Sequence, residues 1–521
     1  MPEHPLHTEV VSQQELSTTA VTKRTAKYLA LGFLTILLLP MVAQLLFPTD
    51  VVGPFPFPPT RNTLREFEKR LTQASGLQQY FQPRVQALLT GTGHFGNEKV
   101  TVGKNGWLYY TPGLQYLFGR PVLDPQVLAA RAKSMVDKDG VTDPHPNPLP
   151  ALQQLADDCR KWGIHLIVVP VPDKAQFVPE PLASTGQLQN SDFEVFAKKL
   201  EARGAEVVRI KRGNYTGQFL KQDTHWTPTL MDEVAKQLAD RAAKWLAASA
   251  VAPKFQTEKR TVSNFGDLVD LLKLPRSQQL YPPEQVVIEQ VQNTASTAAD
   301  VLLLGDSFSL IYSSNLLNWG ESAGLGEHLA LHMNRQVDRI AVNGSAATGV
   351  RQELLRAAAE GRLTPKKVII YEFTVRDLAS GDWRPIPLMD PPTLEPPVLP
   401  NVIPRLSPSI KTDPLVVRGT IEFLSPPIDP ANASYKEALQ FGKVRIIVVE
   451  SGKYAGRYAI VVFRAMEDRK LLVGGQHRQG DSVHLQLVPL SQARAEIRSM
   501  QRSDETTDYD LTPMFVVKEL P

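Results

Sequence analysis

Short, mostly apolar runs alternate with amphipathic segments through the middle of the chain, and this alternation is its most regular pattern. Runs of this kind are typical of strands that are buried on both faces. Such strands are predicted over residues 164–171, 205–210, 301–304, 337–342 and 367–373. Helical periodicity predicts helices over residues 150–162, 191–203, 227–248, 265–274, 308–318 and 351–359. The order predicts an α/β domain whose mostly parallel sheet has flanking helices on both faces.

Polar side chains that stand directly after these strands mark the edge of the sheet where a site is expected. Asp173, Ser307, Asn343 and Arg376 each follow a predicted strand. In open parallel sheets, ligands bind at the carboxyl ends of the strands. We therefore expect these side chains to gather at one edge.

The segment over residues 28–47 is apolar and uncharged, whereas residues 1–27 are polar. About 20 such residues cross a bilayer as a helix. Lys23, Arg24 and Lys27 precede the segment, so it is predicted to be a single-pass anchor in the inner membrane. Residues 1–27 would lie in the cytoplasm and the remainder in the periplasm or outside the cell. A cleaved signal peptide is the alternative, although no small-residue cleavage motif follows the apolar run.

Two proline-rich stretches divide the rest of the chain. Residues 48–61 predict a stiff spacer, and residues 385–414 predict an extended linker. Residues 62–384 between them hold the α/β domain. This domain is expected to begin with a helix over residues 62–89 and a hairpin whose turn is Asn105-Gly106.

The final segment, residues 415–521, has a different pattern. Strands separated by turns are predicted over residues 415–424, 444–449, 458–463 and 483–487. This pattern predicts a small all-β domain, either a sandwich or a barrel, and no catalytic cluster is visible in it.

Composition narrows the function classes. The 57 lysines and arginines nearly balance the 54 acidic residues, which leaves a net charge of +3 and argues against nucleic acid as a partner. The single cysteine, Cys159, excludes an intrachain disulfide. The chain contains no phosphate-binding loop and no dinucleotide fingerprint, so we expect no cofactor.

Ser307, His225 and Asp223 form a self-consistent set of candidate catalytic residues. Gly305-Asp306-Ser307 follows the most apolar strand, where a turn can expose a hydroxyl. A serine needs a nearby base to become a nucleophile, histidine suits that role, and a carboxylate orients the imidazole. Ordinary turn chemistry is the alternative for Gly-Asp-Ser, because Asp and Ser are common helix caps.

Other residues near these loops are candidates for supporting roles. The backbone N–H of Ser307 and the side chain of Asn343 would form an oxyanion hole. Arg376 and Trp226 are candidates for substrate binding, with simple packing as the alternative for Trp226. Asp-x-His also fits zinc, but no further His or Cys pair with ligand spacing accompanies it, so we expect no metal.

Four motifs in order, VGKNGWLYY, VPVPDKAQFVPE, DTHW and LLLGDSFS, carry a resemblance to a known family. Together they resemble the SGNH-hydrolase-like domain of the alginate O-acetyltransferase family over roughly residues 60–385. The resemblance implies Ser307 as nucleophile, His225 as general base and Asp223 as its orienting partner. The residues from about 415 onward do not match the carbohydrate-binding module of that family.

The resemblance also implies a function. Such proteins deliver acetyl groups to hydroxyls of an exported polysaccharide, and a membrane-bound O-acyltransferase supplies the acetyl group. The expected activity is therefore a serine-dependent O-acetyltransferase. A carbohydrate acetylesterase would use the same residues with water as acceptor, and a non-catalytic glycan-binding scaffold is the alternative from another class.

Overall fold

The computed structural model describes most of the chain, in two compact units. The described residues are 22–46, 55, 57, 59–139, 141, 143–178, 188–211, 217–247, 253–391, 414–430, 433–509 and 511–521. One unit is Met1–Leu89 with Lys273–Arg276, and the other is Thr90–Leu272 with Ser277–Pro521. The second unit contains both the α/β domain and the C-terminal β domain.

The N-terminal unit is helical in its described part. It contains α2 (Lys23–Leu46) and α3 (Arg61–Gln73), and α4 (Gly76–Gly93) begins in it. The single helix predicted over residues 62–89 is therefore two helices. The break falls at Ser75, whose hydroxyl accepts the N–H of Gln78 at 3.3 Å and caps the second helix.

The helix α2 covers most of the segment that was predicted to cross the membrane, residues 28–47. Among the residues that the structure describes, however, none forms a helix with both the length and the apolarity to span a bilayer. The predicted anchor and its topology therefore have no support in the structure. Residues 1–21 and 48–54, which belong to the predicted cytoplasmic segment and spacer, lie outside the described residues, as does 392–413 of the linker.

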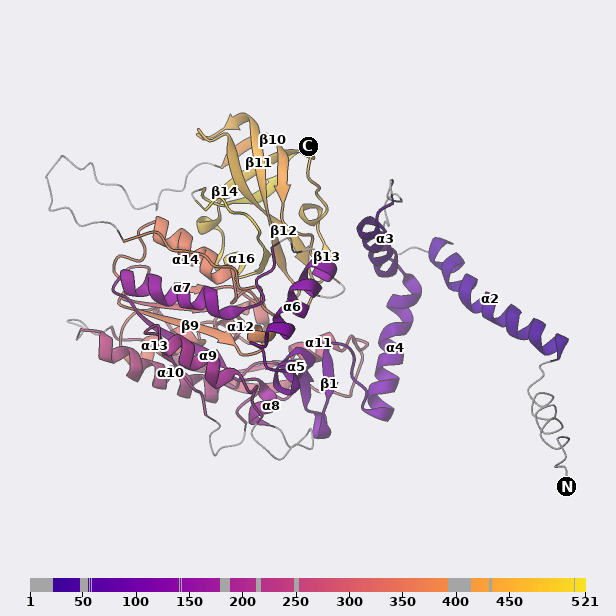
Figure 1. The fold of residues 1–521 in the computed structure, drawn as a ribbon, viewed down its shortest axis with the longest axis horizontal. Helices are drawn as coiled ribbons and strands as arrows, with labels where there is room; N and C mark the ends of the chain where they lie inside the picture. The colour runs from indigo at the N-terminus through magenta and orange to yellow at the C-terminus, as the bar shows by residue number, and fades with distance from the viewer. Residues whose placement is uncertain are drawn as a thin grey trace, which may run out of the picture. The chain divides into compact units, whose positions relative to one another are not determined.

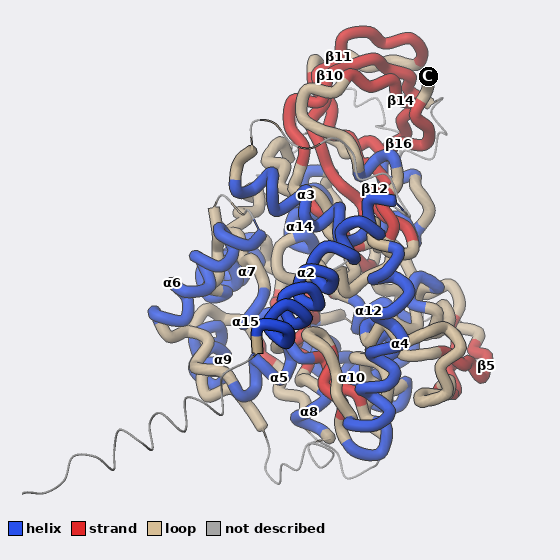
Figure 2. The backbone as a smooth tube through the Cα atoms, turned by 90° about the vertical axis from the view of Figure 1, so that its right-hand side faces the viewer, coloured by secondary structure: helices blue, strands red, loops and turns tan. Residues whose placement is uncertain are grey.

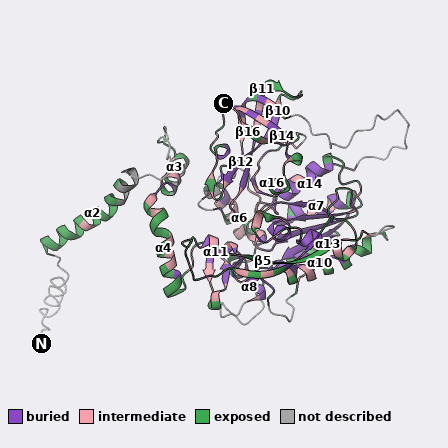
Figure 3. Cartoon of the chain, turned by 180° about the vertical axis from the view of Figure 1, so that it is seen from behind, coloured by how far each residue is buried: buried purple, intermediate pink, exposed green. Residues whose placement is uncertain are grey.

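A five-stranded parallel sheet forms the centre of the α/β domain, as predicted. Its strand order is β4-β3-β9-β7-β8, and all four pairings are parallel. The strands are β3 (His165–Val171), β4 (Glu206–Val207), β7 (Val301–Gly305), β8 (Asp338–Ala341) and β9 (Val368–Thr374). Most residues of these strands are buried, and Figure 3 shows buried residues in the middle of the domain.

Alternate residues of each strand face opposite helix layers, which explains the uninterrupted apolar runs. Leu302 and Leu304 pack with helices of one layer, whereas Val301 and Leu303 pack with helices of the other. The first layer holds α7 (Pro148–Lys161), α9 (Phe193–Glu201) and α14 (Gly349–Ala359), and the second holds α10 (Pro228–Ala242) and α13 (Leu325–Met333). Figure 1 shows α7 and α14 on one side of β9, with α10 and α13 on the other.

Shorter elements connect the strands and helices. The predicted hairpin is present as β1 (Val100–Val102) and β2 (Leu108–Tyr110), and Asn105 takes the left-handed conformation in its turn, with φ of 56°. The remaining helices are α5 (Thr111–Phe118), α6 (Pro125–Ser134), α8 (Lys174–Phe177), α11 (Asp267–Leu271), α12 (Ser307–Leu310) and α15 (Asp377–Ser380).

Two differences from the predicted elements affect the site. The helix expected over residues 308–318 is only α12, because the chain turns away after Leu310. An antiparallel ribbon of β5 (Thr257–Asn264) and β6 (Glu284–Val291) was not predicted, since β5 is polar and mostly exposed and has no apolar run.

The C-terminal domain is all-β, as predicted, and its main sheet closes on itself. Five strands pair in the order β12-β16-β14-β10-β11, and β11 pairs with β12 again. They are β10 (Leu415–Leu424), β11 (Ala438–Ser451), β12 (Tyr458–Glu467), β14 (Ser482–Pro489) and β16 (Met514–Glu519). Closure selects the barrel over the sandwich. Figure 2 shows β10, β11, β14 and β16 together.

A cluster of His328, His332 and Asp232 joins α13 to α10. The Asp232 carboxylate accepts hydrogen bonds from His328 Nδ1 and His332 Nε2, at 2.6 Å each. The Nε2 of His328 lies 3.1 Å from the carbonyl oxygen of Glu289, so the protonated ring satisfies both acceptors. Burial alone would lower the pKa of His328, but these contacts raise it above its ordinary value of 6.5.

We expect Asp232→Asn to lower the free energy of unfolding by about 1 kcal/mol at about pH 6. A raised pKa means that the stabilisation is complete below the ordinary value and is lost as pH rises through the raised value. The difference from wild type should therefore shrink at about pH 9. Urea unfolding at both pH values measures it, with Asp240→Asn on the exposed side of α10 as control. Equal losses at both pH values would contradict this assignment.

Candidate active site

The loop that carries Asp223 and His225 is a tight turn held at both ends. Phe219 and Trp226 form a bridge across it, and the N–H of Leu220 donates to the carbonyl of His225 at 3.0 Å. Thr227 then caps α10 by accepting the N–H of Leu230. The buried aromatic residues anchor the turn in the core, while Asp223, Thr224 and His225 between them line a pocket.

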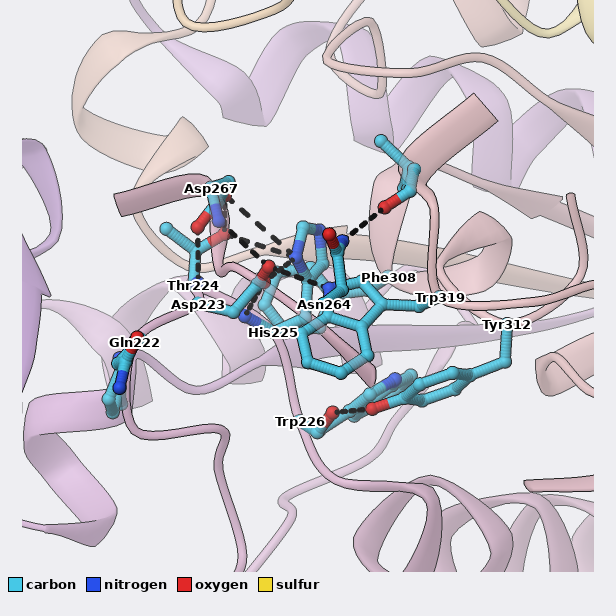
Figure 4. Close-up of polar contacts among 12 residues, drawn as sticks. Gln222, Asp223, Thr224, His225, Trp226, Asn264, Asp267, Phe308, Tyr312 and Trp319 are labelled. Carbon is cyan, nitrogen blue, oxygen red and sulfur yellow. Dashed lines mark hydrogen bonds and ion pairs between the residues drawn. The ribbon is translucent and has the colours of Figure 1, made fainter. Parts of the chain in front are cut away.

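The Asp223 carboxylate is the centre of this loop, and four donors surround it (Figure 4). Its Oδ1 lies 2.6 Å from His225 Nδ1 and 3.1 Å from the His225 backbone nitrogen. Its Oδ2 accepts the indole N–H of Trp319 at 2.9 Å and the N–H of Asp267 at 3.0 Å. The contact places the Nδ1–H of His225 toward the carboxylate and directs Nε2 away from it.

The charge of Asp223 is retained although the side chain is only 2% exposed. Burial alone would raise the pKa of Asp223, but His225, the N–H of Asp267 and the Trp319 indole together lower it below the ordinary value. An ionised carboxylate beside a histidine is the arrangement that stabilises an imidazolium when the ring takes up a proton.

Asp267 braces the same loop from α11. Its two oxygens accept the N–H of Thr224 at 2.8 Å and the Thr224 hydroxyl at 2.6 Å. Gly266 lies directly against the loop, because a Cβ there would come within 2.0 Å of the Gln222 carbonyl oxygen. Only glycine permits α11 to approach the Asp223 backbone this closely.

Ser307 stands at the carboxyl end of β7, as expected, on a turn that a buried carboxylate supports. Asp306 caps the turn by accepting the N–H of Phe308 at 2.8 Å. Glu372 on β9 accepts the N–H of Asp306 at 3.1 Å and the Ser309 hydroxyl at 2.7 Å. Burial and the charge of Asp306 raise the pKa of Glu372 well above its ordinary value.

The first two motifs of the family resemblance, VGKNGWLYY and VPVPDKAQFVPE, hold the His225 loop in place. Lys174 is buried, and its ammonium donates to the carbonyls of Leu108, in the hairpin, and Lys221, in the loop, at 2.6 and 3.3 Å. The N–H of Leu108 donates to the same Lys221 carbonyl at 3.0 Å. The Gly-Lys-Asn-Gly-Trp hairpin and the Asp173-Lys174 turn thus support the His225 loop.

One pocket collects most of the expected site residues. Asp223, His225, Ser307, Asn343 and Arg376 all line it. The pocket offers ≈ 120 Å³ to the centres of water molecules. Because a water occupies about 10–15 Å³ on this measure, the pocket has room for several waters or a small group such as acetyl.

Trp226 is not in this pocket. Its side chain is fully buried, packs edge-to-face on Phe308 with ring centroids 5.2 Å apart, and belongs to the core beneath the loop. The Trp226 carbonyl accepts the Tyr312 hydroxyl at 2.7 Å. The structure places Trp226 in the core, which favours packing over the predicted role in substrate binding.

The imidazole of His225 lies beside the turn that presents Ser307. Its ring centroid is 4.6 Å from that of Phe308, the next residue along the chain. The Nε2 atom is buried and has no hydrogen-bond partner among the described residues. No hydrogen bond joins Ser307 to His225 in this part of the chain, and such contacts often form only when substrate is bound.

The zinc alternative gains a third donor from the structure, Asp267. Ligand atoms of Asp223, His225 and Asp267 lie within 4.8 Å of one another. Every oxygen of the two carboxylates, however, already accepts a hydrogen bond from an N–H or O–H donor. This favours a hydrogen-bonded triad over a cation site. A second group with converging ligand atoms is Asp232, His328 and His332.

Three residues of the site were not found from the sequence: Asp267, Trp319 and Glu372. Glu372 could have been found from the sequence, since it is the one charged residue of the buried strand β9. Asp267 and Trp319 contact the loop across 43 to 96 residues of chain and had no local signal.

Comparison with known families gives a match over more than half of the chain. Residues 100–375 match the family described as "SGNH hydrolase-like domain, acetyltransferase AlgX". A probable alginate O-acetylase AlgJ of Pseudomonas fluorescens is 30% identical over 233 residues, 42% of this chain and 57% of that protein. The AlgJ of Pseudomonas aeruginosa is 25% identical over 324 residues, 55% of this chain and 72% of that protein. The chain thus spans little more than half the length of the first of these relatives.

Solved structures give weaker likenesses. The O-acetyltransferase domain of Pseudomonas putida AlgJ has a TM-score of 0.41 and 21% identity, over 54% of this chain and 93% of that one. Pseudomonas aeruginosa AlgX has a TM-score of 0.36 and 15% identity, over 76% of this chain and 90% of that one.

Trp319→Phe removes the indole donor from Asp223 while keeping an aromatic ring. We expect the free energy of unfolding to fall by about 2 kcal/mol, because a buried carboxylate loses a hydrogen bond. Chemical denaturation measures the change. Trp245→Phe, at a half-exposed tryptophan, is the control and should cost less than about 0.5 kcal/mol. Equal effects of the two substitutions would contradict the importance of this contact.

Proposed function

The chain belongs to the family of the SGNH hydrolase-like acetyltransferase domain of AlgX, and from this membership we propose that it is a serine-dependent O-acetyltransferase. It would move an acetyl group through Ser307 onto hydroxyls of a polysaccharide. The observation that carries the proposal is that Ser307 and His225 line one pocket, while Asp223 binds the far side of the imidazole. The His225 Nε2, which has no partner among described residues, is the atom available to a serine proton.

In the first half-reaction, Ser307 Oγ attacks the carbonyl carbon of an acetyl ester or thioester donor. His225 Nε2 takes the hydroxyl proton as the Oγ–C bond forms, and Asp223 stabilises the resulting imidazolium. When the bond from the acetyl carbon to the donor breaks, the proton passes from His225 to the leaving group. The product is acetyl-Ser307 and the deacetylated donor.

The second half-reaction runs the same steps with a sugar hydroxyl. His225 takes the proton of the sugar hydroxyl, and the sugar oxygen attacks the acetyl carbon. The bond between the acetyl carbon and Ser307 Oγ then breaks, and Ser307 Oγ regains a proton from His225. Asn343 and the backbone N–H of Ser307 are the proposed oxyanion donors in both halves. The guanidinium of Arg376 makes no hydrogen bond within the described chain and lines the same pocket, where it would contact donor or acceptor.

The relatives suggest a setting for this reaction. They are named as probable alginate O-acetylases, so alginate is the first acceptor to consider. We propose an extracytoplasmic place of action, where an exported polymer is accessible, and a membrane-bound O-acyltransferase as the source of acetyl groups.

Mass spectrometry of the full chain after incubation with an acetyl ester should find acetyl-Ser307. Ser307→Ala should abolish the adduct, and His225→Ala should slow its formation by about 10³-fold or more. Ser263→Ala, at an exposed serine of β5, is the matched control and should leave the rate unchanged.

The molecule that accepts the acetyl group distinguishes a transferase from an esterase. Transfer of acetyl to added alginate oligosaccharides would support the transferase, whereas release of acetate alone across several glycans would identify an esterase. Absence of the Ser307 adduct, together with undiminished polymer acetylation by Ser307→Ala, would favour a scaffold and contradict the proposal.

A chelator gives an independent test. Because the oxygens of Asp223 and Asp267 are already hydrogen-bonded, we expect treatment with EDTA to leave the rate of Ser307 acetylation unchanged. Loss of activity that added Zn²⁺ restores would assign the cluster to a metal instead.

A further inference from the structure

The C-terminal domain has a topology that is used elsewhere to bind chains of sugars or nucleotides. Numbered along the chain, its five main strands close in the order first, second, third, fifth, fourth and first again. The third and fifth strands, β12 and β16, are parallel, and the first and fourth, β10 and β14, are antiparallel. This is the arrangement of the OB-fold, whose ligands bind at the loops between strands one and two and between strands four and five. Topology alone assigns no function, so the argument rests on where these loops lie.

The first of these loops lines the pocket of the candidate active site. Ser434, Tyr435, Lys436 and Glu437, which precede β11, form part of its wall, as does Arg469 in the turn after β12. The α/β domain supplies Ser307 and His225 to the same pocket. One cavity therefore has its reacting groups on one domain and a second wall on the other.

Two contacts hold this wall in place. The ammonium of Lys436 lies 2.5 Å from the Asp270 carboxylate on α11, the same helix that braces the His225 loop through Asp267. The N–H of Arg469 donates to the carbonyl of Lys436 at 3.0 Å, which joins the turn to the loop. The second wall is thus connected to the support of the catalytic loop.

The loop between strands four and five, β14 and β16, contacts α14 and attaches the C-terminal domain to it. Buried ion pairs join Arg356 to Asp504 at 3.0 Å and Arg502 to Glu353 at 2.6 Å. The N–H of Asn343 donates to the carbonyl of Ser499 at 2.9 Å, beside the pocket. Removing one partner of a buried pair is strongly destabilising, so the contact fixes the domain over the sheet edge.

Two polar groups of this wall, the Arg469 guanidinium and the Tyr435 hydroxyl, make no hydrogen bond among the described residues. Arg469 is partly buried, yet its guanidinium makes no hydrogen bond or ion pair within the described residues, although Asp267 and Asp270 act on its charge. Tyr435 packs its ring on the core of the β domain, and burial raises its pKa to about 12, so the hydroxyl keeps its proton. A guanidinium donates to hydroxyl and carboxylate oxygens, and an aromatic ring offers a flat apolar surface to a sugar.

We propose that Tyr435 and Arg469 of the C-terminal domain form the acceptor-sugar subsite of the active site. This inference rests on the proposed acetyl transfer and adds where the acceptor binds and which residues select it. The wall would hold one sugar of the polymer so that its hydroxyl meets acetyl-Ser307 in place of water. The C-terminal domain is then a part of the catalytic centre and not a separate binding module.

Binding of an alginate hexasaccharide to full-length Ser307→Ala protein tests this without any chemistry. Isothermal titration should show that Arg469→Ala, added to that background, raises Kd by about tenfold or more, and that Tyr435→Ala does so as well. Arg478→Ala, at an exposed arginine of the same domain that does not line the pocket, is the matched control. Its Kd should stay within about twofold of the parent value.

Failure of this inference and failure of the proposed function give different results. If neither Arg469→Ala nor Tyr435→Ala changes Kd more than Arg478→Ala does, or if the parent protein binds no hexasaccharide, the subsite assignment is wrong. If wild-type protein forms no acetyl-Ser307, the proposed function fails whatever the titrations show. In protein that retains Ser307, Arg469→Ala should shift the products from acetylated sugar toward free acetate. An unchanged ratio would also overturn the assignment.

Discussion

A single buried carboxylate, that of Asp223, determines the geometry of the candidate site. Its two oxygens accept hydrogen bonds from its own loop, from α11 and from Trp319, which lie far apart in the sequence. A buried charge is tolerable only when donors surround it, so these segments must converge for the fold to be stable. The same requirement that stabilises the fold therefore orients the imidazole of His225 toward the pocket.

Support for the candidate site comes from several elements around it. Asp267 holds Thr224, Lys174 holds the hairpin against Lys221, and Glu372 holds the turn before Ser307. None of these three acidic or basic groups needs to touch a substrate. Their common effect is to keep two loops from different strands at a constant separation, which is the condition for efficient proton transfer between them.

Local patterns in the sequence were sufficient for the parallel sheet, for the turn at Ser307 and for the neighbourhood of Asp223 and His225, because each depends on adjacent residues. Trp319 could not be predicted in this way, since only the folded chain brings its indole to Asp223. The closure of the C-terminal sheet was equally invisible, because it depends on pairing between β11 and β12 and on a last strand, β16, that was not predicted. The ribbon of β5 and β6 could not be located from apolar runs, because β5 is polar and mostly exposed. The roles of Ser307, His225 and Asp223 remain proposals.

The contact between Trp319 and Asp223 spans 96 positions of the chain. Such a contact forms only once the intervening chain has closed into a loop, at a cost in conformational entropy. A nascent or partly folded chain would therefore carry the serine without an oriented base beside it. If Ser307 carries the proposed acetyl transfer, its reactivity would appear only with the completed native state.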